Sequence, residues 1–119
     1  MTSHNVQFLS ASSINGDKVK NPQGESLGKI EDLMINLESG RVTYAVLSFG
    51  GFLGLGEKYF AIPMEALTLD PEDKVFILNV PKEKLDAKNG FDKDNWPNMA
   101  DREWATGIYS HYEYKPYWD

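Results

Sequence analysis

Short apolar runs separated by turn residues recur along residues 17–80, and this spacing is typical of an all-β domain. Two turns carry a clear signature: Asn21-Pro22-Gln23-Gly24 and Leu37-Glu38-Ser39-Gly40 each end on a glycine, which accepts a positive φ angle. Asp70-Pro71-Glu72-Asp73 forms a third turn. The pattern predicts strands at Asp17–Asn21, Glu25–Leu37, Arg41–Phe49, Tyr59–Pro63 and Lys74–Val80.

The second predicted strand alternates apolar and polar residues, as a half-buried strand does. Leu33, Ile35 and Leu37 share one face, but Ile30 is out of phase with them. A β-bulge near Glu31-Asp32 restores the register, and bulges also help small sheets to curl into barrels. We therefore expect a bulge there and a curled sheet.

The third predicted strand is apolar on both faces. Val42, Tyr44 and Val46 point to one side, and Ala45, Leu47 and Phe49 point to the other. Because a barrel has only one interior, another part of the chain must cover the outer apolar face.

The residues that follow the last strand are the natural cover. The segment from Phe91 onward holds eight of the fifteen aromatic residues, a density too high for a disordered extension. Pro81–Asp86 is predicted to form a short helical turn, and Asn98 to cap a helix at Met99–Tyr112. On that helix, Trp104, Ala105, Ile108 and Tyr109 share one face, whereas Asp101, Arg102 and Glu103 point outward.

Composition narrows the functional classes. The chain has 119 residues, no cysteine and a formal net charge of −6, with lysines scattered among acidic residues. Cysteine chemistry is therefore excluded, and nucleic acid is not an expected partner, because its binding needs clustered basic side chains. No apolar run is long enough to span a membrane, and no leader is indicated. We expect a soluble, cytoplasmic protein with one domain and no membrane insertion.

Four blocks of this sequence resemble the PRC-barrel domain, which occurs in the H subunit of photosynthetic reaction centres and in the ribosome maturation factor. They are Asn21–Leu33, Ser39–Tyr44, Gly50–Gly56 and Ala61–Leu67, in that order, and the resemblance covers Leu9–Val80. The resemblance implies a mainly β fold, a small curled barrel at residues 8–80. It also implies an assembly module without catalytic residues that often binds itself. The segments Phe91–Pro97 and Tyr117-Trp118 resemble those that follow the barrel in stand-alone bacterial members. We expect residues 81–119 to form a C-terminal extension that packs on the barrel or on a neighbouring subunit.

The glycine-rich stretch Gly50–Gly56 allows three interpretations. It lacks the Gly-Lys-Ser/Thr ending of a phosphate-binding loop. A tight corner between two strands explains its glycines well. A docking tip that exposes Phe52, Leu53 and Leu55 is the functional alternative.

Metal and catalytic chemistry have weak support. Asp92, Asp94 and Asn95, with Asp101 and Glu103, do not follow calcium-loop spacing and are expected to be solvated. His4 and His111 are the only histidines, and no acid–base pair accompanies them. Arg41 is expected to pair with Glu38 or Asp32, and Met64–Leu67 to form one helical turn that closes the barrel end.

The sequence thus predicts a non-enzymatic interaction module that forms a homodimer or higher oligomer, with a different protein as a second possible partner. It predicts no cofactor, no metal site and no catalytic residue. The predicted interaction residues are exposed or aromatic: Phe52, Leu53, Leu55, Trp96, Trp104, Tyr109, Tyr117 and Trp118. The alternative is a small-ligand or metal-binding protein, with a pocket between barrel and extension lined by Trp96, Trp104 and Tyr112. An enzyme that uses carboxylates such as Asp92 and Asp94 is the weakest alternative.

Overall fold

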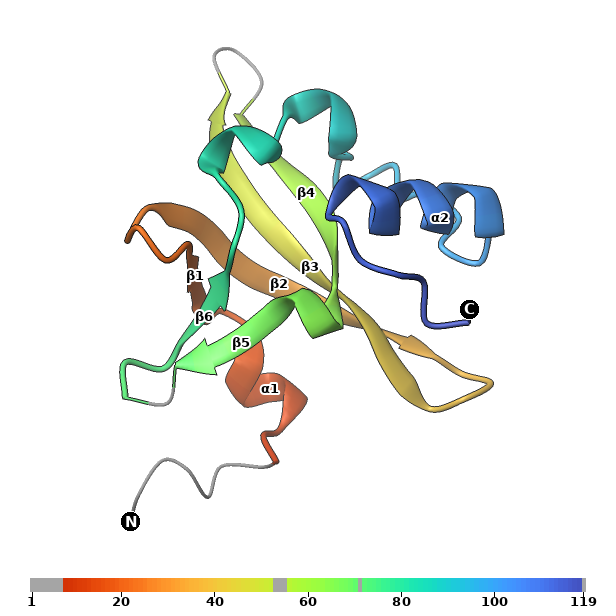
Figure 1. Ribbon diagram of the computed structural model, residues 1–119, viewed down its shortest axis with the longest axis horizontal. Helices are drawn as coiled ribbons and strands as arrows, with labels where there is room; N and C mark the ends of the chain where they lie inside the picture. The colour runs from red at the N-terminus through yellow and green to blue at the C-terminus, as the bar shows by residue number, and fades with distance from the viewer. Residues whose placement is uncertain (1–7, 53–55, 71, 119) are drawn as a thin grey trace.

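The computed structural model describes residues 8–52, 56–70 and 72–118 and shows a mainly β fold with one longer helix (Figure 1). A short helix, α1 (Ala11–Ile14), precedes the sheet, and this helix was not expected from the sequence. The strands are β1 (Lys18–Lys20), β2 (Ser26–Asn36), β3 (Arg41–Phe52), β4 (Gly56–Pro63), β5 (Leu67–Asp70) and β6 (Val75–Leu78).

One sheet contains all six strands in the order β4-β3-β2-β1-β6-β5. The long strands β2, β3 and β4 form an antiparallel meander, whereas β1 pairs with β6 in parallel. Within the described residues the order does not close on itself, because the edge strands β4 and β5 are not paired with each other. The expected curled barrel is therefore an open, curled sheet. Strand β5 was not expected from the sequence.

A buried asparagine organises the first hairpin turn. The Asn21 side chain is 1% exposed, and its Oδ1 accepts hydrogen bonds from the backbone N–H groups of Gln23 and Glu25. Its Nδ2 donates to the Glu25 carboxylate at 2.7 Å and to the Val80 carbonyl at 3.3 Å. The predicted turn is confirmed, and the same side chain ties it to the segment that follows β6.

The pairing of β2 with β3 contains two register shifts, of which one was predicted. The register shift between Ile30 and Asp32 confirms the expected bulge, and Ile30 is accordingly buried. A second shift lies between Met34 and Ile35. Its extra residue is Thr43, on the β3 side of the pair. At the same end of β2, Ile35 is 53% exposed and Leu37, in the turn after it, is 93% exposed. The expectation that both share a buried face with Leu33 is therefore wrong.

The two faces of β3 enter two different hydrophobic clusters, as its sequence predicts. Ala45, Leu47 and Phe49 lie in the main core, together with residues of β1, β2, β4 and β6. Tyr44 lies on the opposite face in a second cluster with Ala61 and Tyr109. The outer face of the sheet is thus buried by the C-terminal extension.

The extension contains two 3-10 helices, η3 (Lys82–Lys84) and η4 (Ala87–Asn89), and then the α-helix α2 (Arg102–His111). The short turn predicted near Pro81–Asp86 is confirmed by η3. Helix α2 begins later than predicted, because the cap is Asp101, whose carboxylate accepts the Glu103 N–H at 3.0 Å. Asn98 instead accepts from the Ala100 N–H in the preceding turn.

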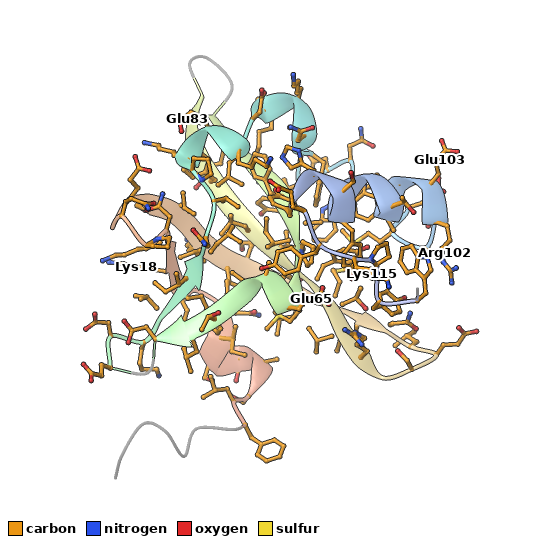
Figure 2. The ribbon with its side chains drawn as sticks, viewed as in Figure 1. Lys18, Glu65, Glu83, Arg102, Glu103 and Lys115 are labelled. Atoms are coloured by element: carbon orange, nitrogen blue, oxygen red, sulfur yellow. The ribbon has the colours of Figure 1, made fainter. Side chains whose placement is uncertain are left out.

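The faces of α2 follow the predicted pattern. Ala105 and Tyr109 are buried against the sheet, with Trp104 and Ile108 half-buried beside them. Figure 2 shows Arg102 and Glu103 on the outer side of the helix, and both are exposed. The helical turn predicted at Met64–Leu67 is present as η2 (Met64–Ala66), with Ala66 buried and Leu67 already in β5.

Candidate interaction surfaces

The C-terminal end of the extension is held on the β2–β3 hairpin. Asn36 Nδ2 donates a hydrogen bond of 2.9 Å to the Tyr117 hydroxyl. The Arg41 guanidinium lies 4.9 Å from the centroid of the Tyr117 ring, and the Arg102 guanidinium lies 4.4 Å from that of Trp118. Such cation–π contacts each contribute about 0.5–1 kcal/mol at exposed positions. The last residues of the chain therefore cover their own sheet.

The start of the extension is held on the edge strand β4. Phe91 and Tyr59 exchange two backbone hydrogen bonds of 2.8 Å, which form an isolated antiparallel bridge. Lys58 Nζ lies 2.7 Å from the Asp92 carboxylate. The Trp96 indole N–H donates to the Lys93 carbonyl at 2.7 Å, and its ring lies 5.9 Å from that of Tyr59. The bridge also satisfies part of the β4 edge, which limits edge-to-edge pairing there.

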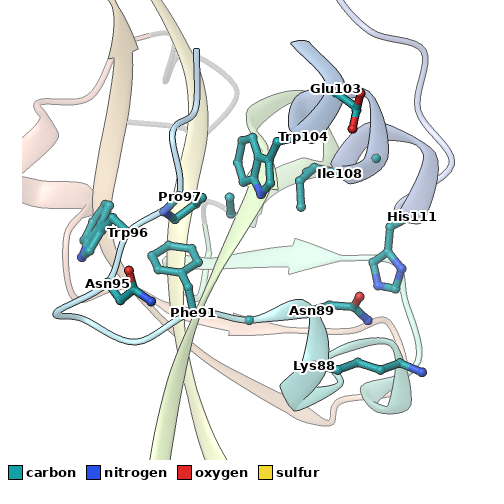
Figure 3. Close-up of a pocket in the computed structure, with 13 residues that line it drawn as sticks. Lys88, Asn89, Phe91, Asn95, Trp96, Pro97, Glu103, Trp104, Ile108 and His111 are labelled. Carbon is teal, nitrogen blue, oxygen red and sulfur yellow. The ribbon is translucent and has the colours of Figure 1, made fainter. Parts of the chain in front are cut away.

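Between these two attachments lies a pocket of about 530 Å³, which we call the aromatic pocket (Figure 3). Trp104 and Ile108 of α2 face the loop that carries Phe91, Trp96 and Pro97. The remaining lining residues are Ala61, Lys88, Asn89, Gly90, Asn95, Glu103, Gly107 and His111. One end of the pocket is therefore aromatic, and amide and imidazole groups lie at its margins.

A second concavity of about 600 Å³, which we call the hairpin groove, lies along the β2–β3 hairpin. Its walls carry both apolar and polar groups and come from three segments far apart in the sequence. The apolar side chains include Met34, Ile35, Leu37, Met99, Tyr117 and Trp118. The side chains of Ile35 and Leu37 at this groove are exposed to solvent.

The Arg41 side chain forms a different ion pair from the one expected. Its guanidinium lies 3.2 Å from the Glu65 carboxylate, rather than pairing with Glu38 or Asp32. The reason is that η2 brings Glu65 to the outer side of β3, where Arg41 also stacks on Tyr117. Both charged side chains are at least one-third exposed, so the pair adds little stability.

The structure distributes the predicted interaction residues over several places. Leu53 and Leu55 lie outside the described residues, as does the side chain of Phe52. Trp96 and Trp104 line the aromatic pocket, whereas Tyr117 and Trp118 line the hairpin groove. Tyr109 is fully buried between these two concavities, in contact with Tyr44, Tyr117 and Trp118. A partner could reach it only if the extension moved away.

Two further assignments change with the structure. Tyr112, expected beside Trp96 and Trp104, is 4% exposed in the main core and does not line the aromatic pocket. Ile35 and Leu37 were expected to share a buried face with Leu33 but lie at the surface. The run of apolar residues Leu33-Met34-Ile35 was the available signal that this end of the strand departs from a half-buried pattern, because it breaks strict alternation.

The acidic residues of the extension serve local structure. Asp92 pairs with Lys58, and Asp101 caps α2. Within the part of the chain that the structure describes, no group of three His, Cys, Asp or Glu side chains could hold a metal ion. His111 lies against Tyr112, and its Nε2 is 2.9 Å from the Lys84 carbonyl, which joins α2 to η3.

Burial raises the pKa of several tyrosines that pack the extension against the sheet. Desolvation, with smaller contributions from Tyr117 and Glu65, raises the pKa of Tyr44 to about 12. Desolvation also raises the pKa values of Tyr109 and Tyr112. Burial in an apolar cluster disfavours the phenolate, so these side chains stay neutral in the folded protein.

This burial predicts a loss of stability in alkali. In the unfolded chain tyrosine titrates near pH 10, so the stabilising difference is complete below about pH 10 and is lost as pH rises towards about 12. We expect urea unfolding at pH 11 to show a lower free energy of unfolding than at pH 8. Tyr44→Phe, which cannot ionise at this position, should reduce the slope of the free energy of unfolding against pH between these two pH values. An unchanged slope in that variant would contradict the prediction.

Comparison with known sequences places the chain in a family. A search of curated proteins finds no match. Among the described residues, no helix has the length and apolar character needed to cross a membrane. The family model of the PRC-barrel domain matches residues 7–85, which span more than half of the chain and run from the segment before α1 to the end of η3. The match agrees with the curled six-stranded sheet, and the chain belongs to the PRC-barrel domain family.

Proposed function

We propose that this protein is a non-enzymatic assembly module that binds a second copy of itself through the hairpin groove. The family is generally non-catalytic, and a PRC-barrel domain suggests an interaction or assembly role. The observation that carries the proposal is the exposed pair Ile35 and Leu37 at the hairpin groove. A second copy that covers these two side chains removes their apolar surface from water, which favours association.

The arrangement of the hairpin suits a symmetric dimer. The β2–β3 hairpin projects from the body of the molecule (Figure 1). Residues of this hairpin form part of the groove. In a two-fold interface each copy offers the same surface to the other. The Leu37 side chain of one copy can therefore fill the groove of the other, against Met99 and Trp118, while its own groove is filled in return.

The charges at the groove are compatible with a second copy as the partner. The chain carries a formal charge of −6, so two copies repel each other over most of their surfaces. The groove is an exception, because the charged residues that line it are one acid, Glu38, and one base, Arg102. In a symmetric pair these opposite charges add no net repulsion.

The test is the mass of the protein in solution, measured by light scattering after size-exclusion chromatography at several micromolar concentrations. We expect a dimer for the natural chain. Leu37→Asp should weaken association about a hundredfold to ten-thousandfold, because a symmetric dimer buries two copies of Leu37 and burial of each contributes about 1.5–3 kcal/mol. The fold should survive, since Leu37 is exposed in the single chain.

Phe8→Asp is the matched control, because Phe8 is also an exposed apolar side chain, at 91%, but lies outside the groove. It changes charge and apolar surface in the same way and should leave the dimer intact. A natural chain that is monomeric at every concentration would refute the proposal. Equal effects of the two substitutions would place the interface elsewhere.

A further inference from the structure

We propose that the aromatic pocket is a binding site for a small, uncharged, planar nitrogen heterocycle of one or two rings. The inference goes beyond self-association, because this pocket and the hairpin groove share no lining residue. A volume of about 530 Å³ lies in the range of about 300–1,000 Å³ that small-molecule sites occupy.

The shape of the ligand follows from the rings. The ring centroids of Phe91 and Trp96 lie 5.2 Å apart on one side of the pocket. Trp104 enters from α2 on the other side (Figure 3). Trp96 is 37% exposed although it belongs to this aromatic group. Flat ligands gain most from such a site, because a planar ring can stack on aromatic side chains.

The polar character of the ligand follows from two asparagines. Asn89 and Asn95 both line the pocket, and the Asn89 side chain is half-buried whereas that of Asn95 is exposed, so both amides are accessible to a ligand. Each amide offers donors and an acceptor. Together they match the edge of a heterocycle that carries both donors and acceptors, as a nucleobase does.

Charge indicates a neutral ligand. The charged lining residues are Lys88 and Glu103, one of each sign, so the pocket has no net charge to attract an ion. An anionic or cationic compound would therefore gain little over a neutral one of the same shape.

The position of Gly107 is a further observation that favours a binding site. It lies inside α2 and lines the pocket, where a side chain would meet nothing within 4 Å. Glycine inside a helix is destabilising compared with alanine. No close contact of the fold requires glycine here, but its missing side chain keeps the pocket open.

The experiment is a titration of the natural chain with adenine and, separately, with uracil, followed by the indole N–H signals in NMR spectra. The chain has three tryptophans, and we expect Trp96 and Trp104 to shift with a saturable dependence on ligand. Trp118, in the hairpin groove, is the internal control and should not shift. The absence of a saturable shift with both compounds at millimolar concentration would overturn the proposal.

Gly107→Leu tests the position of the ligand. The added side chain fills the space beside Trp104 and should weaken binding at least tenfold, while helix content is retained. Ser110→Leu is the matched control, because Ser110 is an exposed residue of the same helix that does not line the pocket. If both variants bind as the natural chain does, the ligand is not in this pocket. Because the light-scattering test depends on Leu37, either proposal can fail alone.

Discussion

Replacing Gly28 with alanine should lower the free energy of unfolding by at least about 4 kcal/mol, an effect at the upper end for single substitutions. Gly28 lies in β2 with a φ angle of +99°, which residues with a side chain rarely adopt. A Cβ atom there would lie 2.0 Å from the Ser48 carbonyl oxygen of β3. The backbone of both strands must move to relieve this contact, and β2–β3 pairing holds the sheet together. Urea unfolding followed by circular dichroism measures the loss.

Gly24→Ala is the control for Gly28→Ala. Gly24 also has a positive φ angle, +87°, but a Cβ atom there meets nothing within 4 Å. Only the conformational term remains, and we expect a loss of about 1–2 kcal/mol. If the two variants lose equal stability, steric contact with Ser48 is not the cause of the larger effect.

Local patterns predicted the parts of the fold that depend on neighbouring residues. The phase of Ile30 was enough to locate the bulge of β2. In a pattern with a period of two, one inserted residue moves every later side chain to the other face. The two apolar faces of β3 were enough to predict a cover on the outer face of the sheet. Aromatic density indicated which segment provides it.

Features set by long-range contacts were not predicted. The second register shift of the β2–β3 pair, which leaves Thr43 of β3 unpaired opposite Met34 and Ile35, has no glycine or proline to mark it. The parallel pairing of β1 with β6 joins segments that are more than fifty residues apart. Arg41 forms its ion pair with Glu65 rather than with an acidic residue nearby in the sequence, because η2 brings the chain back to the side of β3 on which Arg41 lies. Sequence spacing does not report such returns.

The candidate sites were predicted in part for the same reason. Trp96 and Trp104 were expected to line a pocket, and they do. Their meeting depends on the bridge between Phe91 and Tyr59, which places the loop of Trp96 opposite α2. Tyr112 was expected with them, but it lies one turn beyond Ile108, where the helix ends and the chain enters the main core.

Replacing Tyr109 with alanine should lower the free energy of unfolding by about 3–5 kcal/mol, as aromatic truncations in packed cores do. The Tyr109 ring is fully buried and contacts the rings of Tyr44, Tyr117 and Trp118. Its loss leaves a cavity between α2 and β3, and the C-terminal residues lose the surface on which they pack. Urea unfolding gives the loss. Tryptophan fluorescence, to which Trp118 contributes, should show increased exposure to solvent.

Tyr109→Phe separates the ring of Tyr109 from its hydroxyl. This hydroxyl is buried and has no hydrogen-bond partner in the described part of the chain. A buried polar group without a partner is destabilising, so phenylalanine should keep the packing and equal or exceed the natural chain by up to about 1 kcal/mol. A loss as large as that of the alanine variant would show that the hydroxyl is bonded in solution. The stability of the extension would then rest on that bond as well as on aromatic packing over the outer face of the sheet.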